Sequence, residues 1–171
     1  MNHVISMLDV KDTLSDIIDD AIDMKLHGHG KDLEDRILAM IFEKSSTRTR
    51  VSFEAGMRRL GGHAIYLGKN DIQLGRGETI EDTALVLSRY ADFIMYRAFS
   101  HADMVELARH ATVPVISGLD DEEHPCQVIT DLMTIKEHKG RLDGLHLAYY
   151  GDGNNNMANS LMLGAAMTGM K

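Results

Sequence analysis

Five short apolar runs recur along the chain, and their spacing constrains the fold more than any other feature of the sequence. Most of them are apolar throughout, without the alternation expected of a strand that has one face in water. Such strands are typical of a sheet that is covered on both faces. The runs are ILAMIF (37–42), HAIYL (63–67), DFIMYR (92–97), VPVIS (113–117) and HLAYY (146–150).

Segments with helical periodicity lie between these runs. In one of them Phe53, Met57 and Leu60 fall at i, i+4 and i+7, and the pair Gly61-Gly62 then ends the helix. Strands that alternate with helices predict βαβ units. The expected fold class is α/β, a three-layer domain with a central parallel sheet and helices on both faces. Further helices are expected at 13–27, 83–90, 101–110 and 125–138.

Two polar stretches interrupt the alternation. Residues 68–79 form a long loop with three glycines, and residues 139–145 resemble a linker. Beyond the linker lie one strand and one helix, which cannot cover their own apolar surface. We therefore expect a first domain over 1–138, and we expect 139–171 to be the first βα unit of a second α/β domain whose remainder is absent.

Composition and charge exclude several classes of protein. The chain has 171 residues, of which 44% are apolar, and it contains no run of about 18 apolar residues that could span a membrane. The formal charge of -8 disfavours nucleic acid as a partner. The N-terminus turns acidic too early for a secretion signal. The single cysteine, Cys126, suits a reducing compartment, so a cytoplasmic location is expected.

Polar clusters follow four of the five runs, at the point where each expected strand ends. The carboxyl ends of parallel strands meet at one edge of a sheet, which is where ligands bind in open α/β folds. The clusters are SSTRTR after Phe42, Arg97 with His101, GLDDEEHPCQ after Ser117, and GDGNNN after Tyr150.

The first cluster, SSTRTR, has the donors of an anion site. A helix N-terminus presents free N–H groups, and Ser46, Thr47 and Thr49 add hydroxyl donors. Arg48 adds a planar guanidinium suited to phosphate oxygens, whereas Arg50, two residues on, belongs to another helix face. The alternative is a Ser/Thr helix cap beside solvated arginines. Arg97, at a neighbouring strand end, favours the phosphate site.

The HPCQ segment offers polar groups of a different kind. His124 can donate to a carbonyl oxygen, and Gln127 can both donate and accept, which suits a carboxamide-like group. Simple capping of the helix that Pro125 begins is the alternative. Cys126 is interpreted as a small buried thiol. The residues alone thus predict a pocket for a small phosphorylated compound with a carbonyl, acting by positioning and electrostatic stabilisation.

No metal site is expected from the histidines. HGHG at 27–30 is the only close pair, and we interpret it as a helix end.

Together these motifs resemble the aspartate/ornithine carbamoyltransferase family. FEKSSTRTRVSFE, Gln73 in the 68–79 loop, MYRAFSH, HPCQ and DGNNNMANS occur in the family's order and spacing, and they are more similar to the ornithine branch than to the aspartate branch. The resemblance implies two domains, with carbamoyl phosphate on the first and the amino acid L-ornithine on the second. It implies transfer of the carbamoyl group to the δ-amine of ornithine, giving citrulline and phosphate, a step of arginine biosynthesis. No metal or organic cofactor is implied.

The resemblance also assigns roles to residues. Arg97 would contact both the phosphate and the carbamoyl oxygen, and Gln73 would reach the site of a neighbouring subunit in a homotrimer or a higher oligomer. Asn156 would contact the α-amino acid end of ornithine, with Asn155 as the alternative. Ser46, Thr47, Arg48 and Thr49 would hold the phosphate, while His124 and Gln127 would polarise and orient the carbamoyl group.

Family members are about twice as long as this chain, which fits a two-domain size. The chain alone is therefore expected to bind carbamoyl phosphate weakly and to be inactive. Carbamoyltransferases for putrescine, N-acetylornithine or aspartate are alternatives, because the acceptor is recognised mainly in the absent half. A non-catalytic phosphate-binding or trimer-forming module is an alternative of another class.

Overall fold

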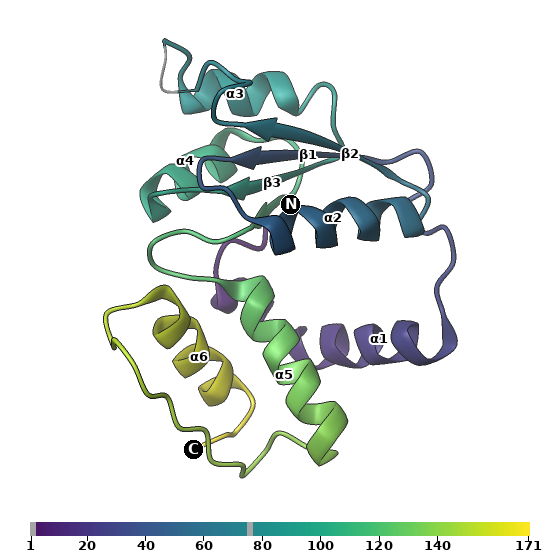
Figure 1. Ribbon diagram of the computed structural model, residues 1–171, viewed down its shortest axis with the longest axis vertical. Coiled ribbons are helices and arrows are strands. Elements are labelled where there is room, and N and C mark those ends of the chain that lie inside the picture. Colours follow the sequence, from purple (N-terminus) through teal and green to yellow (C-terminus); the bar gives the residue numbers. More distant parts are fainter. Residues whose placement is uncertain (1–2, 75–76) are drawn as a thin grey trace.

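The structure, a computed structural model, describes residues 3–74 and 77–171. Its sheet has four parallel strands in the order β2-β1-β3-β4 (Figure 1). The parallel sheet and four of the predicted strands are thereby confirmed. The strands are β1 Ile37–Phe42, β2 His63–Gly68, β3 Phe93–Arg97 and β4 Val115–Ser117.

Among the described residues, three α-helices lie between the strands, as the periodicity predicts, while one precedes β1 and two follow β4. The helix predicted at 83–90 begins and ends three residues earlier, at Ile80–Leu87. Pro125 occupies the first turn of its helix, and the HGHG segment is a helix end, with Gly28 at a φ of 86° after the last helical residue. The helices are α1 Leu14–His27, α2 Thr47–Arg59, α3 Ile80–Leu87, α4 His101–His110, α5 Pro125–Lys139 and α6 Asn156–Met167, preceded by a 3-10 turn, η1, at Met7–Val10.

Alternate side chains of the central strand β1 face opposite helical layers, since successive residues of a strand point to opposite faces. Ala39 and Ile41 lie in a buried cluster with side chains of α3 and α4. Leu38 and Met40 lie in another, together with Met57 of α2. Helices therefore cover both faces of the sheet, which confirms the three-layer prediction.

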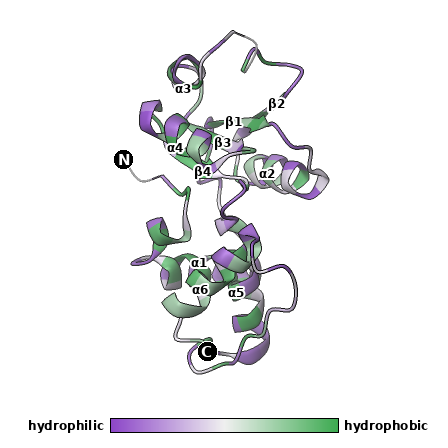
Figure 2. Cartoon of the chain, turned by 90° about the vertical axis from the view of Figure 1, so that its left-hand side faces the viewer, coloured by the Kyte–Doolittle hydropathy of each residue, from purple (hydrophilic) through white to green (hydrophobic). Residues whose placement is uncertain are grey.

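A second group of helices packs beneath this sheet. Side chains of η1, α1, α5 and α6 share one buried cluster (Figures 1 and 2). The contact between α5 and α6 is close at Gly164, where an added Cβ would lie 2.7 Å from Cγ1 of Val128. This packing brings the start of α6 to the loop that precedes α5.

The fifth predicted strand, at 146–150, is wrong: these residues form no strand. A strand needs a hydrogen-bonded neighbour, and among the described residues the backbone of this segment pairs only with Lys171. The N–H of Leu147 donates to the carbonyl of Lys171 (2.8 Å), and the N–H of Lys171 donates to the carbonyl of Leu145 (2.8 Å). An apolar sequence without further partners thus remains irregular.

The strand order creates a switch point between β1 and β3. The chain passes from β1 to β2 on one side and later returns to place β3 on the other side of β1. Ligands of open α/β sheets bind outside the carboxyl ends of the strands at such a point. The register places Arg97, the last residue of β3, opposite Phe42, the last residue of β1. The loops after both strands therefore begin side by side.

Candidate functional site

The N-terminus of α2 follows β1 after a four-residue connection, residues 43–46. Ser46 is the N-cap: its Oγ accepts a hydrogen bond from the N–H of Thr49 (3.3 Å) and donates to Oγ1 of Thr49 (3.0 Å). The capping interpretation therefore holds for Ser46. It does not account for the hydroxyl of Thr47 or the guanidinium of Arg48, both of which are exposed at the same helix end.

The two arginines of this segment have different surroundings. Arg50 pairs with Glu54 (2.9 Å) and lies over the ring of Tyr66, 3.7 Å from its centroid. Arg48 makes no hydrogen bond or ion pair with any residue that the structure describes. Arg48 is therefore free to bind an anion at the helix N-terminus, whereas Arg50 is committed to its neighbours.

Arg97 links the end of β3 to two neighbouring segments. Its Nη1 donates to the carbonyl of Gly118 (2.9 Å) and contacts Oγ1 of Thr49 at 3.5 Å. Burial lowers the pKa of the guanidinium from its usual value, although an arginine remains charged at neutral pH. A positive charge thus lies between the start of α2 and the loop after β4.

A cavity of about 250 Å³ lies where these segments meet. It is lined by residues of α2, by Gly118 after β4, and by the first residues of α5. The structure thereby brings together side chains that the sequence placed at separate strand ends. The lining residues are Arg48, Thr49, Ser52, Phe53, Gly118, His124, Cys126, Gln127 and Thr130.

Two buried nitrogen atoms make no hydrogen bond, one on a residue that lines the cavity and one on Arg97, which contacts Thr49 of the cavity wall but does not itself line the cavity. They are Nε of Arg97 and Nδ1 of His124, and the hydroxyl of Tyr96 is the third such side-chain atom among the described residues. Buried polar groups are paired in the great majority of cases, so unpaired ones mark a site that binds something else. Both nitrogen atoms belong to residues predicted to bind carbamoyl phosphate.

Comparisons with known proteins identify the family of this chain and the fold that it shares with them. The sequence model of the aspartate/ornithine carbamoyltransferase carbamoyl-P binding domain matches residues 2–137.

The chain belongs to this family.

Its relatives include an ornithine carbamoyltransferase of Picrophilus torridus, which is 61% identical over 98% of this chain and 55% of its own length. A catabolic ornithine carbamoyltransferase of Thermoplasma volcanium is 54% identical over 98% of this chain and 55% of its own length. The ornithine carbamoyltransferase structure from Pyrococcus furiosus superposes with a TM-score of 0.92 at 49% identity, over 98% of this chain and 55% of that one. The chain thus spans about half the length of the curated relatives it matches.

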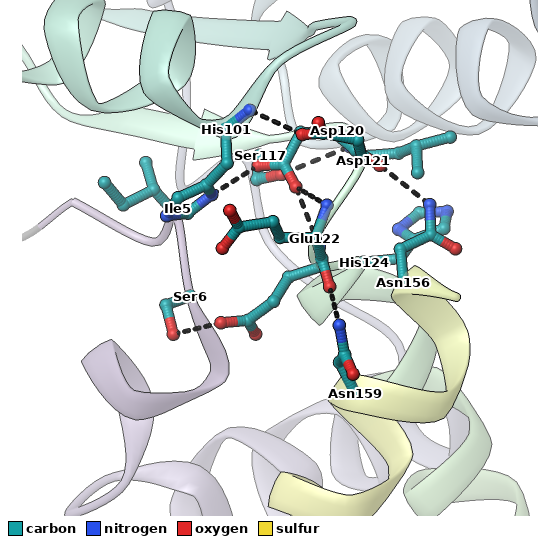
Figure 3. A network of polar contacts seen from close by, with 12 residues as sticks. Ile5, Ser6, His101, Ser117, Asp120, Asp121, Glu122, His124, Asn156 and Asn159 are labelled. Carbon is teal, nitrogen blue, oxygen red and sulfur yellow. Dashed lines mark hydrogen bonds and ion pairs between the residues drawn. The ribbon is translucent and has the colours of Figure 1, made fainter. Parts of the chain in front are cut away.

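Within this family framework, the loop that connects β4 to α5 is held by a buried carboxylate. Asp120 is fully buried, and its Oδ1 accepts hydrogen bonds from the N–H groups of Glu122 (2.9 Å) and Glu123 (2.7 Å). Its Oδ2 lies 2.8 Å from Nδ1 of His101 (Figure 3). The loop ends at His124, so Asp120 determines where the backbone of His124 lies.

His124 and His101 have pKa values shifted in opposite directions. Burial, together with the positive charge of Arg97, lowers the pKa of His124 to about 4, although Asp120 opposes the shift. The pKa of His101 is raised above its usual value: burial alone would lower it, but the hydrogen bond and negative charge of Asp120 outweigh burial. At neutral pH His124 is therefore uncharged, and it can donate a hydrogen bond without carrying a full charge.

The two histidines should titrate on opposite sides of 6.5, the ordinary pKa of a histidine side chain. In an NMR titration from high to low pH, the ring of His101 is expected to become protonated first, with a midpoint above pH 6.5. The ring of His124 should stay neutral until the pH falls to about 4. Coincident midpoints for His101 and His124 would contradict the buried position of His124 and the pairing of His101 with Asp120.

The remaining predicted site residues lie at different distances from the cavity. Gln127 lines it, and its amide donates to Asp131 (2.9 Å). Asn155 is the N-cap of α6, with its Oδ1 accepting from the N–H of Met157 (2.8 Å). Asn156 donates through Nδ2 to the carbonyl of Asp120 (2.7 Å) and so lies beside the loop of His124.

Gln73 does not line the cavity. It is exposed in the predicted polar loop 68–79, of which residues 75–76 lie outside the described residues. Its predicted contact is with a neighbouring subunit, so that role stays a prediction.

Cys126 lines the cavity as a thiol. Its Sγ donates to the carbonyl of Ser117 (3.4 Å), and burial raises its pKa to about 11. A thiol with this pKa is protonated at neutral pH and is a poor nucleophile, which agrees with the interpretation from the sequence.

Within residues 3–74 and 77–171, no group of three His, Cys, Asp or Glu side chains is arranged to hold a metal ion. The described helices include none long and apolar enough to cross a membrane.

Proposed function

We propose that this chain is the carbamoyl-phosphate-binding half of an ornithine carbamoyltransferase. The proposed reaction is attack by the δ-amine of L-ornithine on the carbamoyl carbon, with phosphate as the leaving group and L-citrulline as the product. The observation that carries the proposal is the shared cavity, with Arg48 and Thr49 on one wall and His124 and Gln127 on the other. The names of the relatives support ornithine as the acceptor.

The phosphate is assigned to the start of α2. Its unpaired N–H groups and partial positive charge favour an anion, and Thr47 and Thr49 contribute hydroxyl donors. The hydroxyl of Ser46 would join them by turning from Thr49 to the phosphate. Arg48 has no competing partner among the described residues and can form a bidentate contact with phosphate oxygens. A net charge of -8 does not oppose this, because local donors, not the overall charge, determine binding at a site.

The carbamoyl group is assigned to Arg97, His124 and Gln127. Arg97 places positive charge where the carbonyl oxygen and the leaving phosphate gain negative charge. Preorganised donors of this kind, in a site shielded from water, lower the energy of the transition state. His124, neutral because its pKa is about 4, serves as a donor to the carbonyl oxygen. Gln127 orients the amide nitrogen of the same group.

The amino acid is assigned to Asn156 and, next to it, Asn155 at the start of α6. We infer that residues 1–138 form the carbamoyl phosphate domain and that 139–171 begin the domain for the amino acid. The pairing of Leu145 and Leu147 with Lys171 supports this inference, because α6 then connects two parallel segments, as in a βα unit. A homotrimer with Gln73 in a neighbouring site and a cytoplasmic location are further parts of the proposal.

Two questions about the reaction remain alternatives within the proposal. Putrescine, N-acetylornithine or aspartate would replace ornithine if the second domain differed. The second question is the metabolic direction: arginine biosynthesis is the proposed role, and relatives from two Thermoplasma species carry the name catabolic. An assembly or phosphate-binding module without catalysis is the candidate of a different class.

Calorimetry with carbamoyl phosphate tests the proposal on the 171-residue chain. Binding heat is expected, with weaker binding of inorganic phosphate, since phosphate lacks the group assigned to Arg97, His124 and Gln127. Citrulline formation by this chain alone is expected to be undetectable. No binding of carbamoyl phosphate would leave only an assembly role. Equal affinities for carbamoyl phosphate and phosphate would contradict the carbamoyl assignment.

A further inference from the structure

Three side chains on one face of α6 form hydrogen bonds with the backbone of the loop that ends at His124. Nδ2 of Asn156 donates to the carbonyl of Asp120 (2.7 Å), and Nδ2 of Asn159 donates to the carbonyl of Glu122 (3.0 Å). Oγ of Ser160 accepts from the N–H of His124 (2.9 Å). Figure 3 shows Asn156 and Asn159 on α6 directed at this loop. The spacing i, i+3 and i+4 places all three side chains on one side of the helix.

We propose that Asn159 and Ser160 are positioning residues for His124. This inference rests on the proposed function, in which His124 contacts the carbamoyl group. The two residues act on the backbone of residues 122–124 and do not line the cavity.

The backbone contacts determine the position of His124, because its ring makes no hydrogen bond through Nδ1 with any described residue. That nitrogen atom is buried. The direction of the ring toward the cavity therefore depends on where the backbone of His124 lies. Ser160 is fully buried, so its hydroxyl is a fixed acceptor for the N–H of His124.

Ser160 is itself held in place by a chain of contacts. Its Oγ also lies 3.4 Å from Oε2 of Glu123, the residue before His124. Glu123 accepts from Oγ of Ser6 (2.6 Å) and from the N–H of Met7 (2.9 Å). The N-terminal turn, the loop and α6 thus meet at one carboxylate. A displacement of α6 relative to η1 would break contacts at Glu123 and at the N–H of His124.

The same helix begins with the residues assigned to the amino acid. Asn155 and Asn156 form its N-terminus, and Asn159 and Ser160 lie one turn further along. A helix moves as a rigid unit, so a shift of α6 when the acceptor binds at its N-terminus would move the loop of His124 with it. Binding of the acceptor would thereby adjust the group that orients the carbamoyl carbon, and the coupling would be reciprocal.

Two substitutions test the positioning role. Asn159→Leu keeps about the size of the side chain and adds no charge but removes the N–H donor, and Ser160→Ala removes the acceptor for the N–H of His124. Met162→Ala is the matched control, since Met162 is 64% exposed on the same helix. Amide hydrogen exchange and ring titration of His124 are measured by NMR on the 171-residue chain, with thermal unfolding as a check on the fold.

Loss of one such hydrogen bond is expected to speed exchange of the His124 amide by about two- to tenfold. The midpoint of the His124 ring should rise from about 4 toward 6.5 in both variants, because a loosened ring gains solvent. Affinity for carbamoyl phosphate should fall in parallel, while Met162→Ala changes none of these.

Unchanged exchange and titration in folded variants would overturn the positioning role. If Ser160→Ala does not fold, Asn159→Leu decides the question alone, because the contact of Asn159 is at the surface and its loss should leave the fold intact. The NMR measurements need no ligand. Failure of the wild-type chain to bind carbamoyl phosphate would therefore reject the proposed function but leave the positioning of His124 to be judged on its own.

Discussion

Replacing Asp120 by alanine is expected to lower the free energy of unfolding by about 3 kcal/mol. The carboxylate is fully buried and satisfies the N–H groups of Glu122 and Glu123 as well as Nδ1 of His101. Alanine would leave both N–H groups without an acceptor, and each unsatisfied buried donor costs about 1–3 kcal/mol. Urea unfolding followed by circular dichroism gives the change in free energy.

Asp120→Asn is the matched control. Asparagine keeps an oxygen for the N–H groups of Glu122 and Glu123, and its amide can donate to Nδ1 of His101 when that ring is neutral. A loss of only about 1 kcal/mol is therefore expected, in line with one altered hydrogen bond. The raised pKa of His101 should also fall in this variant, because the negative charge beside it is gone. Equal losses for alanine and asparagine would show that the backbone contacts of Asp120 contribute little.

The strands could be predicted because a strand that is covered on both faces has a continuous apolar run in its sequence. Residues 37–42 are the example: alternate side chains fill two different clusters, so every position is apolar. Residues 146–150 have a similar composition but no sheet to join. Strand propensity is a property of the segment alone. Whether a strand forms also depends on a hydrogen-bonded neighbour elsewhere in the chain, which the sequence of the segment does not reveal.

The cavity could be predicted in outline because each polar cluster directly follows a strand. Arg48 and His124 are far apart in sequence, but parallel strands bring their loops to one edge. The structural roles of Asp120 and Ser160 could not be predicted, because no sequence pattern marks them. Their partners are backbone groups of one folded loop, and Ser160 lies 36 residues beyond His124. In sequence, Asp120 is simply the first residue of the acidic run DDEE, which is typical of a solvated surface.

Arg48→Ala is expected to weaken binding of carbamoyl phosphate ten- to a hundredfold, which corresponds to about 1.5–3 kcal/mol for a hydrogen bond to a charged group. Arg48 lines the cavity and has no other partner among the described residues, so its contribution is directed at the ligand. Calorimetry on the wild type and the variant measures the difference. A role limited to the solvated surface of a capped helix predicts no loss.

Arg58→Ala separates the local contact from the overall charge. Arg58 lies exposed in the last turn of the same helix, and its removal changes the net charge by the same amount. About three turns of helix separate Arg58 from the N-terminus of α2. Binding of carbamoyl phosphate should therefore be nearly unchanged. Arg48→Lys should restore only part of the affinity, because an ammonium group keeps the charge but cannot form the bidentate contact. If Arg48→Ala and Arg58→Ala weakened binding equally, general electrostatic attraction would explain the result, and the assignment of the phosphate to the N-terminus of α2 would fail.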